Sequence, residues 1–144
     1  MRDIRSYFAD YAAYHQTPGN KFFHRLGIPI IVLSLFGMLA RVGTGWVNAA
    51  VALIVVAEVI YFMLEWRLAL AMLFISGAFY LAGAAIPFWI NVALFVVGWI
   101  FQFIGHSVYE HKQPAFLTNF LHLLVGPLWI LNDALPVVKL RDEA

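Results

Sequence analysis

The sequence predicts an all-α integral membrane protein with four transmembrane helices, an N-terminal amphipathic helix and a short C-terminal interfacial or re-entrant segment. Of its 144 residues, 63% are apolar or aromatic and only 12% are charged, whereas soluble domains carry about 25% charged residues. No charge occurs between Arg67 and Glu110, and that stretch can cross a hydrocarbon core twice at about 20 residues per crossing. We expect one membrane domain over residues 1–144.

Residues 1–20 are polar and aromatic and have no apolar centre, so they do not resemble a cleavable signal peptide. Ile4, Tyr7, Phe8 and Tyr11 recur at helical spacing. This pattern predicts an amphipathic helix that lies on the membrane surface. The turn-forming residues at 17–20 then lead the chain into the first span.

Charges and one proline set the bounds of the predicted spans. The long uncharged stretch after Arg67 divides at Pro87, where we expect a tight turn. The apolar run before it contains a single charge, Glu58. The predicted transmembrane helices are 24–42, 46–64, 68–86 and 88–108.

Residues 120–132 are also apolar but include Gly126 and Pro127. A stretch of about 10–14 apolar residues is more typical of an interfacial or re-entrant segment than of a span. Within the spans, Gly77, Gly83 and Gly98 are expected to allow close approach of helices. Asn48 and Asn91 are expected to bond the backbone near the far interface.

The distribution of Lys and Arg predicts the orientation. With four spans, both termini lie on one side, together with all but one of the nine Lys and Arg residues, and only Arg41 lies opposite. The positive-inside rule then makes the termini cytoplasmic. The membrane would be the inner membrane in a bacterium and the endoplasmic reticulum in a eukaryote. The residues on the cytoplasmic side are Arg2, Arg5, Lys21, Arg25, Arg67, Lys112, Lys139 and Arg141.

Composition also excludes several functions. A net charge of +1 provides no field for holding nucleic acid. The absence of cysteine removes thiolate nucleophiles and thiolate metal sites.

The predicted topology places all five histidines near the cytoplasmic interface. His15 and His24 lie at the start of the first span, His106 and His111 at the end of the fourth, and His122 in the short segment that follows. Residues far apart in the sequence are therefore expected to form one layer.

His106 and Glu110 are four residues apart, so on a helix they share one face and can chelate one cation. Imidazole and carboxylate ligands without thiolate suit Fe(II), Mn or Zn. The alternative is that these residues are hydrated at the interface and bind lipid headgroups or backbone. His111 is expected at the surface, and His122 is a ligand, a hydrogen-bond donor behind the ligands or a core histidine. Glu58 is either a functional intramembrane carboxylate or a protonated structural one.

Two motifs resemble those of the 2-hydroxy fatty acid dioxygenases of fatty-acid α-oxidation, which are small polytopic membrane proteins. Their order, spacing and placement at the first and fourth spans agree, and a weaker third motif follows. The first motif is Tyr14-His15, Asn20 and the run His24-Arg25-Leu26-Gly27-Ile28-Pro29, the second is Gln102, Gly105-His106, Glu110 and Pro114-Ala115, and the third is Gly126-Pro127.

The resemblance implies an Fe(II)-dependent enzyme that shortens a 2-hydroxy fatty acid by one carbon with O2 and releases CO2. It makes His15, His24, His106 and Glu110 iron ligands, with His122 ranked behind them, and places catalysis at His106 and Glu110. Zn(II) is a possible surrogate in a purified sample. Three protein ligands leave room in an octahedral site for a bidentate 2-hydroxy carboxylate and O2, while four leave two positions. The residues expected to bind substrate are Asn20, Lys21, Arg25, Gln102 and Lys112.

Three other functions fit parts of the sequence. A small proton-coupled transporter would use Glu58 but would leave the histidine layer unexplained. A membrane di-iron hydroxylase or desaturase would need more histidines, in clusters. A non-catalytic lipid-binding protein would hold no metal. Measuring the metal content of the purified protein separates these functions from the dioxygenase.

Overall fold

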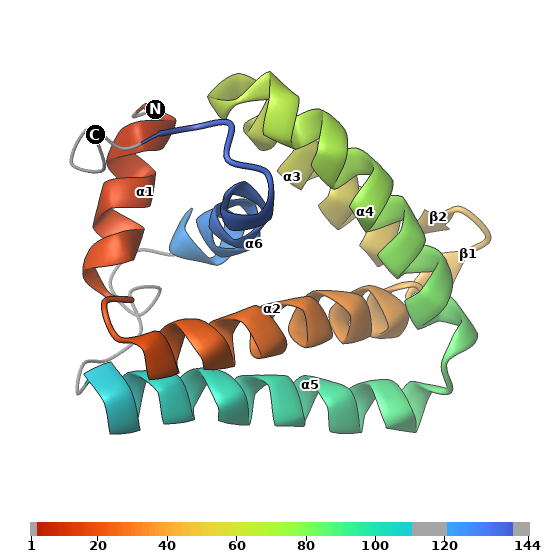
Figure 1. Cartoon of the computed structure of the whole chain (residues 1–144). Helices are drawn as coiled ribbons and strands as arrows, with labels where there is room; N and C mark the ends of the chain where they lie inside the picture. Colours follow the sequence, from red (N-terminus) through yellow and green to blue (C-terminus); the bar gives the residue numbers. More distant parts are fainter. Residues whose placement is uncertain (1–2, 111–120, 140–144) are drawn as a thin grey trace.

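The computed structural model describes residues 3–110 and 121–139, without the side chains of Glu110 and Leu121. In this part of the chain the regular secondary structure is helical apart from one short hairpin (Figure 1). The elements are α1 (Ile4–Ala13), α2 (Pro18–Leu39), β1 (Gly43–Thr44), β2 (Val47–Asn48), α3 (Ala49–Leu64), α4 (Trp66–Ala85), α5 (Phe88–Ile104), the π-helical turn η1 (Gly105–Glu110) and α6 (Leu121–Ala134). β1 and β2 pair antiparallel.

The helices form a wedge. α2 and α5 lie side by side, α3 and α4 form a second pair, and the two pairs meet at the end where the β-hairpin lies (Figure 1). At the opposite end the pairs diverge, and α1 and α6 occupy the space between them. The first and last described segments therefore lie at the open end of the wedge.

Three helical segments are long and apolar enough to cross a membrane: Pro18–Leu39, Trp66–Ala85 and Phe88–Tyr109. α3 is apolar but has only 16 residues, so its crossing stays a prediction. The first of these helices begins at Pro18, six residues before the predicted start. Thr17 caps it by accepting a hydrogen bond from the Asn20 backbone N–H at 3.2 Å, and proline is favoured at the first helical position.

Glycines bring α2 against α4 and α5. A Cβ at Gly37 would lie 2.5 Å from the Gly83 carbonyl oxygen, and one at Gly98 would lie 3.2 Å from the Gly27 carbonyl oxygen. The expected close approach is therefore seen at Gly83 and Gly98. It is wrong for Gly77, which faces open space in the described part of the chain, since a Cβ there would meet no atom within 4 Å.

Side-chain amides and one guanidinium form hydrogen bonds with backbone groups at the narrow end of the wedge. Asn91 donates to the Gly83 carbonyl at 2.9 Å, and the Asn48 side chain caps α3 by accepting from the Val51 N–H at 3.0 Å, as expected. Arg41 donates to the carbonyls of Gly37 and Ile86, at 2.5 Å each. The ends of α2 and α4 are thus tied together.

α1 uses its apolar face inside the protein. Ile4, Tyr7, Phe8 and Tyr11 are all buried, in one cluster with Val125 and Leu128 of α6. The predicted helix exists, while its position on a membrane surface stays a prediction. The segment expected as interfacial or re-entrant is the helix α6, which packs against α1, α2 and α4.

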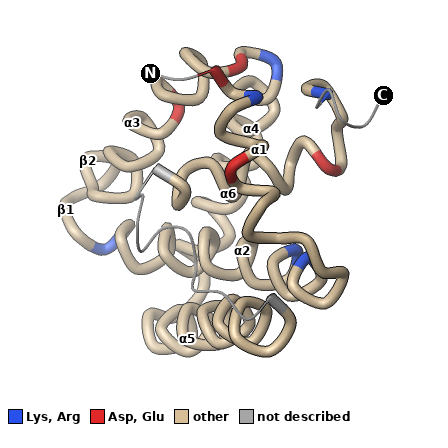
Figure 2. The backbone as a smooth tube through the Cα atoms, turned by 90° about the vertical axis from the view of Figure 1, so that its left-hand side faces the viewer, with Lys and Arg blue, Asp and Glu red and all other residues tan. Residues whose placement is uncertain are grey.

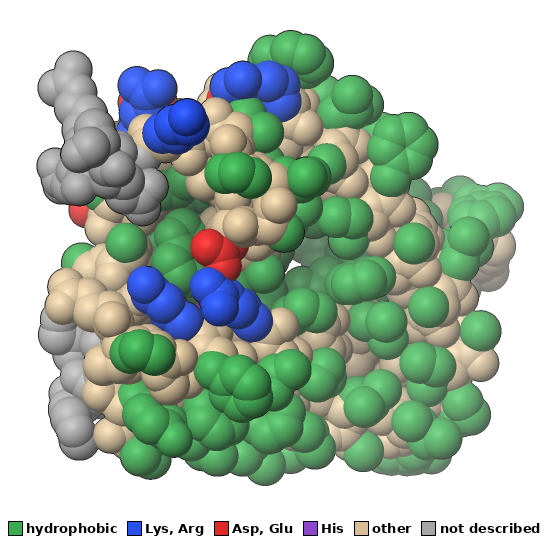
Figure 3. Space-filling view, in the orientation of Figure 1, with side chains coloured by type: hydrophobic (Ala, Val, Ile, Leu, Met, Phe, Trp, Pro, Cys, Tyr) green, Lys and Arg blue, Asp and Glu red, His purple; other side chains and the backbone are tan. Residues whose placement is uncertain are grey.

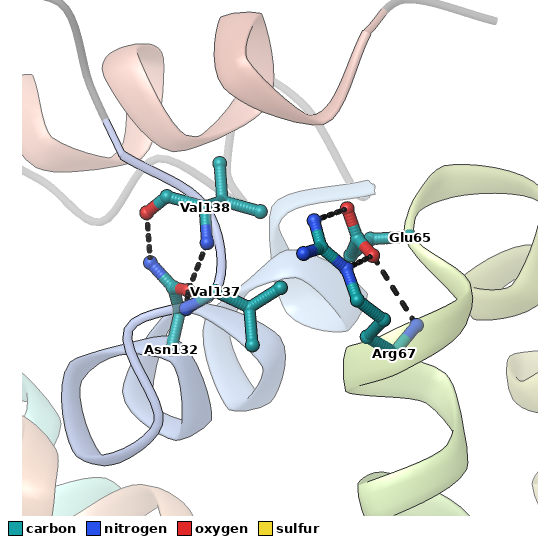
Figure 4. Close-up of polar contacts among 5 residues, drawn as sticks. All are labelled: Glu65, Arg67, Asn132, Val137 and Val138. Carbon is teal, nitrogen blue, oxygen red and sulfur yellow. Dashed lines mark hydrogen bonds and ion pairs between the residues drawn. The ribbon is translucent and has the colours of Figure 1, made fainter.

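Two polar turns close the open end of the wedge (Figure 4). Between α3 and α4, the Arg67 Nε donates to Glu65 Oε1 at 2.8 Å, and this hydrogen bond holds the pKa of Glu65 below its usual value. After α6, the Asn132 side chain accepts from the backbone N–H groups of Val137 and Val138, at 3.0 and 2.9 Å. The chain is thereby turned back towards α1.

Charged residues lie mainly on this end. Viewed from it, Lys, Arg, Asp and Glu are found on α1, the start of α2, the α3–α4 turn and the end of α6, and none lies on α5 (Figure 2). On the face seen in Figure 1, the space-filling view shows a surface dominated by apolar side chains (Figure 3). This asymmetry suits a protein with one end at an aqueous interface.

Candidate metal centre

Three histidines from separate segments meet at the open end of the wedge. His15 lies in the turn after α1, His24 on α2 and His106 on η1. Each is only 2% exposed, and one ring nitrogen of each lies within 4.8 Å of those of the other two. The structure thus brings together three of the four residues expected to be ligands.

Backbone carbonyls fix the orientation of two of the rings. His15 Nδ1 lies 2.6 Å from the Tyr11 carbonyl oxygen, and His24 Nδ1 lies 3.1 Å from the Asn20 carbonyl oxygen. A carbonyl can only accept, so both Nδ1 atoms donate and carry the ring proton. Each neutral ring then presents a lone pair at Nε2. This is how metal-binding histidines are usually held.

The Nε2 atoms face one another. His15 Nε2 lies 2.8 Å from His24 Nε2, which in turn lies 3.1 Å from His106 Nε2. With the protons of His15 and His24 on Nδ1, no hydrogen stands between their Nε2 lone pairs, and an extra proton would place a charge among buried groups. Two ligands about 2.1 Å from one ion and at right angles are about 3.0 Å apart. The residues present therefore fit a transition-metal ion.

Aromatic rings enclose the cluster. Tyr11 stacks on His15 with ring centroids 4.0 Å apart and planes within 10°, and the Trp129 ring centroid lies 5.5 Å from that of His15. Burial raises the pKa of the Tyr11 hydroxyl well above its ordinary value, so it remains a neutral phenol. These rings keep water away from His15 and restrict its orientation.

Asn20 and Gly105 join the segments that carry the histidines. The Asn20 side-chain amide donates to the Tyr14 carbonyl at 2.9 Å, which fixes the turn containing His15, and the Asn20 backbone carbonyl orients His24. A Cβ at Gly105 would collide with Asn20 Oδ1, so glycine lets η1 approach α2. π-helical turns are rare and frequently occur at functional sites, and this one carries His106.

A cavity of about 80 Å³ lies beside the cluster and is lined by the three histidines, Gln102 and His122 among others. Gln102 is 4% exposed, and its Nε2 has no hydrogen-bond partner among the described residues. This donor can bind an oxygen atom of a ligand. His122 lies with its ring centroid 5.8 Å from that of Tyr11 and is outside the group of three.

The remaining predicted site residues lie elsewhere. Lys21 and Arg25 line a second cavity, of about 460 Å³, and Arg25 forms an ion pair with Asp133. The structure does not bring these two cations to the histidines. The Glu110 side chain, His111 and Lys112 lie outside the described residues.

Glu58 is buried on α3 but does not line the histidine cavity. Neither of its carboxylate oxygens has a hydrogen-bond partner among the described residues. Glu58 therefore lies at a site separate from the cluster, and its position within the membrane stays a prediction.

The roles of Tyr11 and Trp129 do not follow from the sequence pattern, in which Tyr11 is only part of an apolar helix face. Its position four residues before His15 was the available signal, because that spacing lets the carbonyl at the end of a helix accept from the following imidazole. No sequence signal connected Trp129 with His15.

The comparisons with known proteins agree with the resemblance of the motifs. A family model described as 2-hydroxy-palmitic acid dioxygenase Mpo1-like matches residues 1–136. The 2-hydroxy-palmitic acid dioxygenase MPO1 of Saccharomyces cerevisiae is 31% identical to this chain over an alignment of 144 residues. The alignment covers 94% of this chain and 81% of that protein. No solved structure gives a significant match.

Proposed function

This chain belongs to the Mpo1-like family, and on that premise we propose that it is an Fe(II)-dependent membrane dioxygenase of fatty-acid α-oxidation. It converts R–CH(OH)–COOH and O2 into R–COOH, CO2 and H2O. The equation balances without another reductant, because the 2-hydroxy acid supplies all four electrons that O2 accepts.

The observation that carries this proposal is the convergence of three Nε2 atoms in a closed, aromatic-lined site. His15, His24 and His106 would hold the ion, and Glu110, four residues after His106 in the sequence, is proposed as a further ligand. His122 ranks behind them. Imidazole and carboxylate without thiolate suit Fe(II), and Zn(II) can replace it in a purified sample. Bound Fe(II) supplies the redox chemistry that lets O2 react with the 2-hydroxy carboxylate.

The other residues of the site bind and shield the substrate. The unpartnered Gln102 Nε2 donates to an oxygen of the substrate head, and Asn20 positions the two motif segments around it. Lys21 and Arg25 line the separate cavity, so we assign them to the approach of the anionic head from the surface rather than to its final position. Lys112 keeps the same proposed role.

We place the site at the cytoplasmic side of the bilayer. The Lys and Arg bias supports cytoplasmic termini, and the histidines lie at the same end of the wedge as the first and last described segments. A lipid substrate can then remain in the membrane while its polar head reaches the metal. The membrane is the inner membrane in a bacterium and the endoplasmic reticulum in a eukaryote.

The test uses the detergent-purified full chain loaded with Fe(II). Incubation with 2-hydroxyhexadecanoic acid in air should yield the one-carbon-shorter acid, with one CO2 released per O2 consumed. Hexadecanoic acid without the hydroxyl group should remain unchanged, and a chelator should abolish turnover. The proposal fails if the iron-loaded protein shortens no 2-hydroxy acid of any chain length.

A proton-coupled transporter is the second candidate, favoured by the buried Glu58 carboxylate, which has no hydrogen-bond partner among the described residues. It would bind no metal and consume no O2. Metal analysis and O2 uptake on one sample therefore separate it, and a non-catalytic lipid-binding protein, from the dioxygenase.

A further inference from the structure

An apolar cavity of about 190 Å³ lies between α2, α4 and α6. α4 contributes Met72, Ile75, Ser76 and Phe79, whose spacing places them on one helical face. α6 contributes residues 127, 130, 131 and 134, which have the same spacing. The surface is hollowed between these three helices (Figure 3). Two helix faces are therefore directed at this space, which they do not fill.

This cavity adjoins the histidine cavity. Ile28, Val32 and Pro127 line both of them. Ile28 and Val32 follow His24 along α2 in steps of four residues, so the three side chains lie along one side of that helix. A ligand whose polar end lies at His24 can extend along the same side of α2 into the apolar space.

The lining restricts what can occupy the apolar cavity. Among the described residues that line it, none is charged, and only Ser76 has a polar side chain. A charged or strongly polar molecule would lose its hydration there without compensation, whereas each buried methylene raises affinity by about fourfold. The occupant is therefore a hydrocarbon chain attached to a head that binds at the histidines.

We propose that this space, which we call the tail cavity, holds the acyl chain of the 2-hydroxy acid substrate and sets the preference for its length. The inference rests on the proposed function, because the head of the same molecule must lie at the histidine cluster. Its test is chosen so that binding can be scored without turnover.

The first experiment maps the chain directly on the full-length protein. A 2-hydroxy fatty acid with a diazirine near its methyl end is photolysed in the presence of the purified protein, and the adducts are located by mass spectrometry. We expect labelling of the cavity-lining residues of α4 or α6 that is removed by excess 2-hydroxyhexadecanoic acid; these are residues 72, 75, 76 and 79 of α4 and residues 127, 130, 131 and 134 of α6. A diazirine next to the head should label residues of the histidine cavity instead. Labelling confined to outward-facing side chains such as Leu70 and Phe74, or unaffected by the competitor, would overturn the assignment.

The second experiment compares two aliphatic-to-tryptophan changes on α4. Ile75→Trp places bulk in the tail cavity, whereas Leu73→Trp places it at a side chain that is 43% exposed and lines neither cavity. With Ile75→Trp, long 2-hydroxy acids should compete about tenfold less well against photolabelling, a loss equivalent to two buried methylenes or slightly fewer. Competition by short 2-hydroxy acids and the metal content should be unchanged. Leu73→Trp should match the unmodified protein. Identical length profiles for both variants would refute the tail cavity.

A third variant covers the case in which Ile75→Trp fails to fold. Phe79→Ala enlarges the cavity and should shift the preference towards longer acids. Competed labelling of the tail cavity without any turnover would refute the proposed reaction alone. Turnover with labelling elsewhere would refute the tail cavity and leave the reaction intact.

Discussion

His24 Nε2 lies 3.1 Å from His106 Nε2, although the two residues are 82 positions apart in the sequence. The same nitrogen of His24 lies 2.8 Å from His15 Nε2. The ring centroids of His15 and His106 are also only 4.8 Å apart, so all three rings contact one another. The centre therefore depends on the contact of α2 with both the turn after α1 and η1. This arrangement leads to the first prediction.

Replacing any one of the three clustered histidines by alanine should lower metal affinity by about tenfold or more. Mutation of residues that only hydrogen-bond to metal ligands already lowers metal affinity by that amount. His24→Ala should lower metal affinity at least as much as His15→Ala or His106→Ala, because His24 Nε2 lies within 3.1 Å of both other Nε2 atoms. Metal per chain, measured by elemental analysis after gel filtration, checks this. His122→Ala is the matched control, as it removes an imidazole from the same cavity but outside the group of three. If its metal loss equals that of His24→Ala, then His122 is a ligand.

Glu110→Gln should reduce iron retention and product formation far more than Glu58→Gln does. Glutamine keeps the size of the side chain but is a poorer ligand, since anionic oxygen suits divalent iron. Glu58 lies on α3 and lines no part of the histidine cavity. Iron per chain and the one-carbon-shorter acid are scored on purified protein. The opposite ranking would mean that the wrong carboxylate was chosen and would support the transporter.

Gly37→Ala should destabilise the protein by about 1–3 kcal/mol, the usual cost of overpacking. The new Cβ would lie 2.5 Å from the Gly83 carbonyl oxygen, which is backbone and cannot move aside easily. Gly77→Ala is the control, because a Cβ there meets no atom within 4 Å and alanine favours a helix by about 1 kcal/mol. The thermal unfolding midpoints in detergent should fall for the first and hold or rise for the second. Equal midpoints would show that α2 and α4 adjust without cost.

Reporter fusions at Ala144 and near Pro87 should report opposite sides of the membrane. The expectation follows from the excess of Lys and Arg on the side of the termini. A cytoplasm-active reporter should work at Ala144, and one active outside the cytoplasm should work near Pro87. If both reporters lie on the same side of the membrane, the chain crosses it an even number of times between the two positions. That result would contradict the four-span topology.

The sequence predicts the helical architecture, and five of the residues that it singles out for the site line the histidine cavity: His15, His24, Gln102, His106 and His122. Hydropathy is a local property, so it located the turn at Pro87 and the long apolar helices that the structure contains. The meeting of His24 and His106 was expected from topology alone, because both lie at the same end of their helices. Helix starts were less accurate, since the cap at Thr17 extends α2 beyond its apolar core.

Features that depend on packing between distant segments were not predictable in this way. The burial of α1 depends on the packing of its apolar face against α6. Either apolar face alone is equally compatible with a helix on a membrane surface, so the sequence does not distinguish the two arrangements. The side on which Lys21 and Arg25 lie depends on how α2 is rotated against α5. The π-helical turn at Gly105 is imposed by contact with Asn20 and leaves no periodic signal.

The long separation between the second and third histidines also determines when the site can exist during biosynthesis. The ribosome makes His15 and His24 first, and a further 82 residues must follow before His106 is available. Until α5 has been inserted and has folded back along α2, the nascent chain offers only the first two imidazoles, which are too few to hold an ion firmly. The proposed metal site can therefore form only after α5 and η1 have been made, so an ion bound there could not guide the helices that precede them.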